Sequence, residues 1–196
     1  MLFGPKDIER VHVGSIERHF YINGPISDEE DYIDLIDSLY QGSPKETIYI
    51  HLNTPGGRLD IAMQILNAIK HSDCDIVGIA DGEVASAGSL ILFACPSIAV
   101  MPYSYVMLHD GSEGAGGKLN ENLKQAQFSH RLLGKLYKEI YIPFFSEKEV
   151  EDVLEGKDIW VTSEEVKERI TKLQEQVEQQ PVEKKVRKNA KKQVQE

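Results

Sequence analysis

The chain has 196 residues, of which 41% are hydrophobic and 28% are charged. This length suffices for one well-buried domain, and the composition excludes collagen-like, low-complexity and wholly disordered chains. With 22 Lys and Arg against 32 Asp and Glu, the formal net charge is −10. An acidic chain of this kind has no global positive field, so we expect no nucleic-acid partner.

The elements expected from the sequence alternate between strand and helix. A strand at 19–23 is followed by Ser27, which we expect to cap a helix because Glu30 follows three residues later, as in a capping box. Further strands are expected at 47–52, 75–80, 98–101 and 105–108, and further helices at 58–70, 85–93 and 118–140. This alternation predicts an α/β domain with one core.

Composition sets the last segment, residues 171–196, apart from the rest of the chain. The last segment is rich in Gln and Lys, has no aromatic residue and contains Pro181. It cannot bury enough apolar surface to offset the entropy lost on ordering, so we expect disorder or a fraying helix. A solubilising tail and a contact made by residues 184–192 both stay open as its role.

The sequence shows no targeting or membrane signal. Its first residues are charged and lack the apolar core of a secretory signal, and the longest apolar stretch, at 89–101, is interrupted by Pro96. That stretch is shorter than the roughly 18 apolar residues that a transmembrane helix needs. Cys74 and Cys95 do not form a Cys-x-x-Cys pair. We therefore expect a cytoplasmic protein with free thiols and no membrane partner.

Metal and nucleotide motifs fail in this sequence. It contains no His-Glu-x-x-His pattern and no Cys/His cluster at zinc spacing. The segment 111–118 (Gly-Ser-Glu-Gly-Ala-Gly-Gly-Lys) lacks the first glycine of a phosphate loop, and Leu119 stands where Ser or Thr would bind magnesium. We predict no metal site and no cofactor in this chain.

Two segments of small residues can support chemistry. Residues 53–57 (Asn-Thr-Pro-Gly-Gly) lie between a strand and a helix, where a glycine pair lets backbone N–H groups point at a developing negative charge. Residues 82–88 place Ser86 at the start of a buried helix, whose free N–H groups and dipole favour an alkoxide or oxyanion. A plain turn and an N-capping serine are the alternative interpretations.

A serine nucleophile needs a base, and the base needs an acid that orients it. His109 ends the strand at 105–108 and precedes Asp110 and Gly111, which places it well to face a cleft. Asp158 lies between charged residues and an apolar pair, where it is either the orienting acid or the cap of a turn.

Four blocks in this order resemble the proteolytic subunit of the Clp protease, a family of serine peptidases with a crotonase-like fold. The blocks are residues 53–57, 82–88, 105–109 and 157–165, and the similarity runs from about residue 19 to residue 170. The resemblance implies a repeated ββα superhelix from which a long handle helix, at 118–140, protrudes. It also makes residues 1–18 a short axial segment and residues 19–170 the peptidase domain.

The resemblance assigns roles to five residues. Ser86 is the nucleophile, His109 is the general base, and Asp158 orients the imidazole. The backbone N–H groups of Gly57 and Ala87 form the oxyanion hole. An extended substrate pairs with the glycine-rich segment that contains Gly111, Gly114, Gly116 and Gly117.

The resemblance also implies partners. These are further copies of the chain in stacked rings, as a tetradecamer of heptameric rings, a Clp-type AAA+ ATPase that uses the ATP, and unfolded polypeptide substrates. The sequence departs from the family at Lys157, where an arginine that links the rings is usual. It departs again at His51, His71 and Gln176, where the ATPase-docking pocket has aromatic or apolar residues.

Three alternatives stay open, and the departures at the docking positions motivate the first of them. The first is a Clp-like peptidase that acts without a Clp ATPase on small, unfolded or dedicated substrates. The second is a non-catalytic ring subunit, against which the intact Ser86, His109 and Asp158 set argues. The third is a crotonase-type acyl-CoA enzyme with Glu83 as its base, which leaves that set unexplained.

Overall fold

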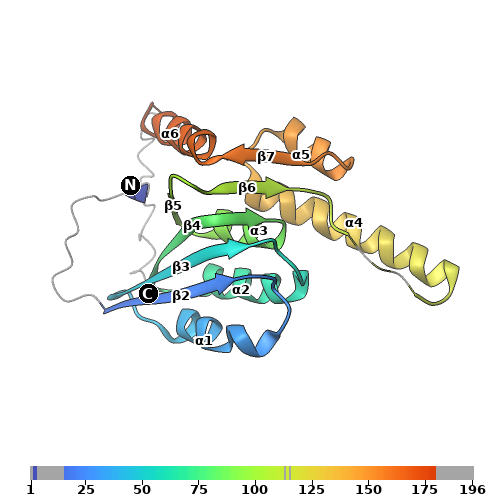
Figure 1. Cartoon of the computed structure of the whole chain (residues 1–196), viewed down its shortest axis with the longest axis horizontal. Helices are drawn as coiled ribbons and strands as arrows, with labels where there is room; N and C mark the ends of the chain where they lie inside the picture. Colours follow the sequence, from blue (N-terminus) through green and yellow to red (C-terminus); the bar gives the residue numbers. More distant parts are fainter. Residues whose placement is uncertain (1, 4–15, 113, 115, 180–196) are drawn as a thin grey trace, which may run out of the picture.

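A computed structural model of the chain describes residues 2–3, 16–112, 114 and 116–179 (Figure 1). These residues form an α/β fold with a mostly parallel seven-stranded sheet, as the alternating pattern predicts. The strands are β1 (Leu2–Phe3), β2 (Ile16–Asn23), β3 (Glu46–Thr54), β4 (Asp75–Ala85), β5 (Ser97–Val100), β6 (Tyr105–Leu108) and β7 (Ile159–Thr162). The helices are η1 (Glu29–Tyr32), α1 (Ile33–Gln41), α2 (Leu59–His71), α3 (Ala87–Ala94), α4 (Leu119–Tyr141), α5 (Glu147–Leu154) and α6 (Ser163–Gln179).

Strand β4 organises the sheet because it is paired along both edges. One edge pairs in parallel with β3; on the other edge residues 77–80 pair with β5 and residues 83–85 pair with β6. The outer pairings of β1 with β5 and of β7 with β6 are antiparallel. The ladder therefore holds the β4 backbone up to its last residue, Ala85.

Helices α1, α2 and α3 cover one face of the sheet (Figure 1). In α2, Ile61, Ile65 and Ile69 recur at helical spacing and are buried against the core. Helix α3 is buried from residue 87 to 93, which matches its uniformly small and apolar sequence. Apolar burial on this face is the main source of stability for the fold.

Helix α4 extends away from the body of the molecule (Figure 1). Its later turns bury Leu133, Tyr137 and Tyr141. Its first turns leave Leu119 and Phe128 exposed. The long helix expected at 118–140 is confirmed, and only its second half belongs to the core of this chain.

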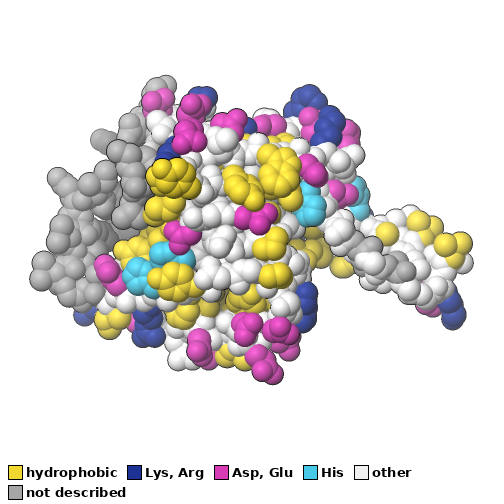
Figure 2. All heavy atoms as spheres, in the orientation of Figure 1, with side chains coloured by type: hydrophobic (Ala, Val, Ile, Leu, Met, Phe, Trp, Pro, Cys, Tyr) yellow, Lys and Arg dark blue, Asp and Glu magenta, His cyan; other side chains and the backbone are white. Residues whose placement is uncertain are grey.

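The opposite face of the sheet carries histidine and aromatic rings over β2 and β3 (Figure 2). His51 Nδ1 lies 2.6 Å from Asp81 Oδ2, and His51 Nε2 lies 3.0 Å from His19 Nδ1. The ring of His19 stacks on Tyr49, and the ring of Tyr21 stacks on His51. We call these five residues the histidine cluster.

Two expectations near the strand ends are wrong. Ser27 caps no helix: Ile26 forms a parallel bridge with Gly57, and Ser27 Oγ donates to Asp28 Oδ2 ahead of the 3-10 turn η1. The strand expected to end at residue 80 continues to Ala85, because β6 supplies a pairing partner for its last residues. Helix α3 consequently begins at residue 87 rather than 85.

The C-terminal part adds elements that the sequence patterns did not predict. Helix α5 has the capping box that was expected at Ser27, formed here by Ser146 and Glu149. Helix α6 continues past residue 170 to Gln179. Residues 180–196 of the expected tail and residues 4–15 of the expected axial segment lie outside the described residues.

Both cysteines are free and buried. The Cys95 thiol donates to the carbonyl oxygen of Ile91, and burial raises the pKa of this thiol to about 12. Within the described ranges, no helix combines the length and the apolar character needed to cross a membrane.

A partly buried ion pair joins α5 to α6. Arg169 Nη2 lies 2.7 Å from Glu149 Oε1, its Nη1 donates to Glu149 Oε2 and to the carbonyl oxygen of Phe144, and its guanidinium lies over the Phe145 ring. Hydrogen bonding to Arg169 lowers the pKa of Glu149 from 4.5 to about 2. The bidentate pair therefore depends on an ionised Glu149.

We expect Arg169→Met to lower the free energy of unfolding at pH 7 by about 2 kcal/mol, because it breaks a charge-assisted bidentate pair. Lys148→Met, which removes the exposed ion-pair partner of Asp152, is the control and is expected to cost less than about 0.5 kcal/mol.

The stabilisation from Glu149 is expected to depend on pH. A carboxyl whose pKa is lower in the folded than in the unfolded chain stabilises the fold above the unfolded pKa, so this contribution should fade as the pH drops from 4.5 to about 2. Urea unfolding of wild type and Glu149→Gln over this pH range measures the contribution as the difference between their free energies of unfolding. A difference that does not change with pH would contradict the role assigned to Glu149.

Candidate active site

Ser86 occupies a sharp turn between the end of β4 and the start of α3. Its φ is 53° and its ψ is −123°, and among the described non-glycine residues it alone has a positive φ. Its N–H donates to the carbonyl oxygen of Met107 at 2.9 Å. A sparsely populated backbone conformation persists only where the surrounding structure holds it, and such positions cluster at functional sites.

Close packing beside Ser86 requires the glycine pair of the 53–57 segment. A Cβ atom on Gly56 would lie 2.6 Å from Ser86 Cβ and 2.7 Å from the carbonyl oxygen of Ala85. Gly56 also has a φ of +93°, which side-chain-bearing residues rarely adopt. The turn after β3 can therefore approach the turn after β4 only because it has no side chain there.

The structure brings the side chain of His109 to that of Ser86. It follows the last residue of β6, and its Nε2 lies 2.7 Å from Ser86 Oγ. In the tautomer with the proton on Nδ1, Nε2 accepts the hydrogen bond from the Ser86 hydroxyl, which is the arrangement of a nucleophile and its base.

Asp158 is not brought into the same hydrogen-bonded group. It precedes β7, whose Ile159 pairs with Leu108, so the register continues to place Asp158 across from His109. Its side chain is exposed, and within the described part of the chain it makes no hydrogen bond with His109. Asp110, which follows His109 in the chain, accepts a hydrogen bond from the Gly111 N–H.

The two expected oxyanion donors lie beside Ser86 and line one cleft. The Ile26–Gly57 bridge uses the carbonyl of Gly56 and the N–H of Arg58, which leaves the Gly57 N–H out of that pairing. Ala87 is the first residue of α3, where helix N–H groups have no intrahelical acceptor. Both N–H groups can therefore bind a negatively charged oxygen.

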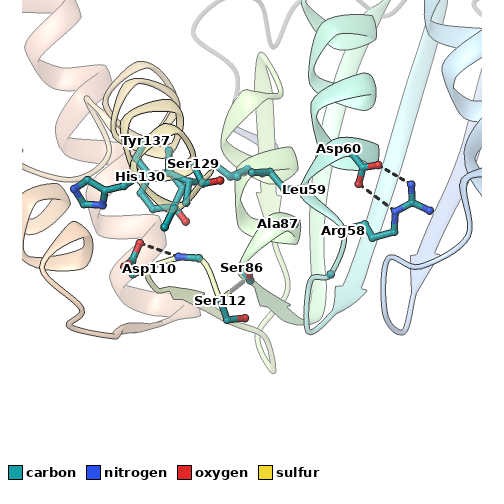
Figure 3. Close-up of a pocket in the computed structure, with 15 residues that line it drawn as sticks. Arg58, Leu59, Asp60, Ser86, Ala87, Asp110, Ser112, Ser129, His130 and Tyr137 are labelled. Carbon is teal, nitrogen blue, oxygen red and sulfur yellow. Dashed lines mark hydrogen bonds and ion pairs between the residues drawn. The ribbon is translucent and has the colours of Figure 1, made fainter. Parts of the chain in front are cut away.

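The cleft at Ser86 has a volume of about 900 Å³ and lies between α4 and the start of α2 (Figure 3). Ser129, His130 and Tyr137 of α4 lie on one side, and Arg58, paired with Asp60, lies on the other. Leu90 and Leu133 make part of its lining apolar. A cleft of this size can hold several residues of a peptide.

Of the four glycines expected to bind substrate, Gly111 lines this cleft. Gly114, Gly116 and Gly117 are exposed and do not line it. The described residues of this segment form no strand with the rest of the chain, so their backbone groups are not used by the sheet.

Sequence analysis missed three hydroxyl-bearing residues behind the site. Tyr137 donates to the carbonyl oxygen of His109, and Ser89 bonds both Tyr141 and the carbonyl oxygen of Ser86. A useful signal was present, since buried tyrosine and serine hydroxyls need hydrogen-bond partners. The described residues contain no group of three or more His, Cys, Asp or Glu side chains able to hold a metal ion.

Comparison with known proteins identifies the family. The Clp protease family model matches residues 11–170. The chain is 27% identical over 161 residues to the ATP-dependent Clp protease proteolytic subunit 1 of Corynebacterium jeikeium, covering 78% of this chain and 83% of the relative. It is 32% identical over 130 residues to the ATP-dependent Clp protease proteolytic subunit 2 of Tropheryma whipplei, covering 64% and 71%. With most of its length matched in this way, the chain belongs to the Clp protease family.

Proposed function

We propose that this chain is a serine endopeptidase, the proteolytic subunit of a Clp-type compartmental protease that hydrolyses unfolded polypeptides. The observation that carries the proposal is the 2.7 Å contact between Ser86 Oγ and His109 Nε2, beside the N–H groups of Gly57 and Ala87, to which no described residue is bonded. Family membership supports the same chemistry, and so does the wide cleft in front of Ser86.

In the proposed reaction, Ser86 Oγ attacks the carbonyl carbon of the scissile bond while His109 Nε2 takes the hydroxyl proton. The negative charge on the carbonyl oxygen is stabilised by the N–H groups of Gly57 and Ala87. The tetrahedral intermediate then expels the amine, which receives the proton from His109, and an acyl-enzyme remains. Water, activated by His109, releases the carboxylic acid and restores Ser86.

We assign the orienting acid to Asp158. The register of β6 and β7 supports this choice, because it puts Asp158 opposite His109 at the ends of two paired strands. A side-chain rotation at the exposed Asp158 would bring its carboxylate toward Nδ1 of His109. No described residue forms a hydrogen bond with this nitrogen, whereas Nε2 contacts Ser86. The acid would then hold the imidazole tautomer that the reaction needs.

The proposed substrate is an extended polypeptide lying in the cleft. Gly111 lines the cleft, and because the described residues among 111–117 belong to no strand, we propose that this segment adds the peptide as a further strand. Main-chain pairing of this kind is independent of side chains, so it suits an enzyme that degrades many sequences.

We propose that the chain assembles with itself as stacked rings. Leu119 and Leu123 are exposed four residues apart on the projecting half of α4, so they share one face of the helix, and covering that face would remove apolar surface from water. This supports an interface there. Lys157 replaces the usual arginine, and its Nζ lies 2.6 Å from Asp152 Oδ1 of its own chain. We therefore place the main contact between rings on α4.

In the leading proposal, a Clp-type AAA+ ATPase feeds the rings. A second candidate is a peptidase that works without that ATPase, and the histidine cluster favours it. His51, where the docking pocket usually has an aromatic residue, is hydrogen bonded to His19 and Asp81 in a polar chain across the sheet. By contrast, the acyl-CoA alternative loses its candidate base, since Glu83 does not line the cleft.

Ser86→Ala is expected to abolish labelling by a fluorophosphonate probe and to lower peptide hydrolysis by at least about 10⁴-fold. Ser112→Ala is the matched control, because Ser112 lines the same cleft, and it should keep both activities. Size-exclusion chromatography with light scattering on the labelled protein gives the size of the active assembly. Full hydrolysis by Ser86→Ala would refute the peptidase proposal, and an active monomer would refute the rings.

Asp158→Asn is expected to reduce kcat by about 10²- to 10⁴-fold, since an amide no longer stabilises the imidazolium. Asp110→Asn, which changes a carboxylate next to His109 in the chain, should leave kcat within about threefold of wild type. Steady-state hydrolysis of a fluorogenic peptide measures both. The reverse order of effects would transfer the orienting role to Asp110.

Adding a Clp-type ATPase with ATP is expected to start degradation of a folded reporter protein that the chain alone leaves intact. Short-peptide hydrolysis without the ATPase is the control for an active preparation. His51→Tyr, which restores an aromatic residue, is expected to increase the stimulation. Peptide hydrolysis without any ATPase effect on the folded reporter, in wild type and His51→Tyr alike, would establish the second candidate instead.

A further inference from the structure

The long helix α4 contacts the backbone of both reacting residues through two tyrosines. Tyr137 and Tyr141 are four residues apart, so their rings lie one above the other on the buried side of the helix, with centroids 5.1 Å apart. Tyr137 donates to the carbonyl oxygen of His109 at 2.9 Å. Tyr141 reaches the carbonyl oxygen of Ser86 through one intervening hydroxyl, that of Ser89.

The direction of the second chain of hydrogen bonds follows from its chemistry. Ser89 Oγ lies 2.7 Å from the carbonyl oxygen of Ser86, which can only accept, so the single hydroxyl proton of Ser89 is used there. Tyr141, whose oxygen lies 2.8 Å from Ser89 Oγ, must therefore donate its own proton to Ser89. Ser89 and Tyr141 are 0% and 1% exposed, so water does not compete for these bonds.

The hydroxyls of Ser89 and Tyr141 restrain Ser86, whose backbone conformation depends on its hydrogen bonds. The N–H of Ser86 donates to the carbonyl oxygen of Met107 in β6. The carbonyl oxygen of Ser86 accepts from the N–H groups of Ser89 and Leu90 in α3 and also from the Ser89 hydroxyl, which links it to Tyr141 of α4. A φ of 53° with a side chain present is sparsely populated, so the turn depends on restraints on both sides of the residue. Burial also raises the pKa of Tyr141, which keeps its proton available as a donor.

Aromatic packing alone does not account for this arrangement. Tyr141 packs edge-on against Phe93 and Phe145, contacts that a phenylalanine would make equally well. The two tyrosines lie on successive turns and add two hydrogen bonds that packing does not need. The Tyr137 hydroxyl donates to the carbonyl oxygen of His109 directly, and the Tyr141 hydroxyl donates to Ser89, which bonds the carbonyl oxygen of Ser86.

We infer that Tyr137 and Tyr141 are positioning residues that set the geometry between Ser86 and His109 from helix α4. This inference rests on the proposed peptidase function. It makes the second half of α4 part of the catalytic machinery, although Tyr141 does not line the cleft. A shift of α4 along its axis would displace the carbonyl groups of both residues together.

The test replaces each tyrosine by phenylalanine, which removes one hydroxyl and keeps the ring. Tyr137→Phe and Tyr141→Phe are each expected to lower kcat for peptide hydrolysis by about tenfold, the effect of losing one positioning hydrogen bond of ordinary strength. For Tyr141→Phe, KM should stay unchanged because this residue lies outside the cleft. Tyr32→Phe, a buried tyrosine in η1, is the matched control and should keep wild-type kcat.

Combined variants distinguish a hydrogen-bond chain from general loosening. Tyr141→Phe together with Ser89→Ala should cost no more kcat than Ser89→Ala alone, because both changes break one chain. Tyr137→Phe together with Tyr141→Phe should multiply the two effects, because those residues act on different carbonyls. Thermal unfolding of all variants shows whether kcat merely follows stability.

Values of kcat within twofold of wild type for both single variants would overturn the inference while leaving the peptidase proposal intact. A wild-type protein that neither hydrolyses peptide nor reacts with fluorophosphonate would refute the peptidase proposal itself. In that case the imidazole NMR signals of His109, assigned by their loss in His109→Gln, decide the inference. A shift of these signals in Tyr137→Phe and Tyr141→Phe, and none in Tyr32→Phe, supports it; identical spectra overturn it.

Discussion

The backbone turn at Ser86 is the constraint on which the rest of the site depends. A serine at a φ of 53° presents its hydroxyl at the end of a strand and, in the next residue, a free helix N–H. The turn is held by strand pairing up to Ala85, by the close approach of Gly56 and by the N–H bond to Met107. Strand β6 thus contributes twice: it pairs with the last residues of β4, and it brings His109 to the serine that follows β4.

The contact between Ser86 and His109 could be anticipated from the sequence, whereas the bounds of several elements around it could not. Ser86 and His109 could be paired because nucleophile and base are recognisable residue types at the ends of apolar segments. The true length of β4 could not be predicted, because residues 83–85 pair with β6, which lies about twenty residues later in the chain. The capping box illustrates the same limit: the Ser-x-x-Glu pattern at Ser27 is overridden by the Ile26–Gly57 bridge, whereas the pattern at Ser146 forms.

The polar support behind the site was hidden for a related reason. Tyr137 and Tyr141 have helical spacing that is equally typical of a plain core, and only the packing of α4 on α3 shows where their hydroxyls go. Conversely, a residue can be recognised in the sequence as a departure from the family while its hydrogen-bond partners cannot be predicted. His51 could be identified as a departure, but its bonds to His19 and Asp81 depend on the register of three parallel strands.

The burial of both thiols gives the folded chain a clear chemical selectivity. Cys74 and Cys95 are the nucleophiles that soft electrophiles would normally find first, yet neither is at the surface, and the thiol of Cys95 stays protonated at physiological pH. Modification of both cysteines by a thiol reagent should therefore be slow in the native protein and faster as the core opens. Thiol modification of the two cysteines therefore reports unfolding of the core, on the same sample in which a fluorophosphonate reports the reactivity of Ser86.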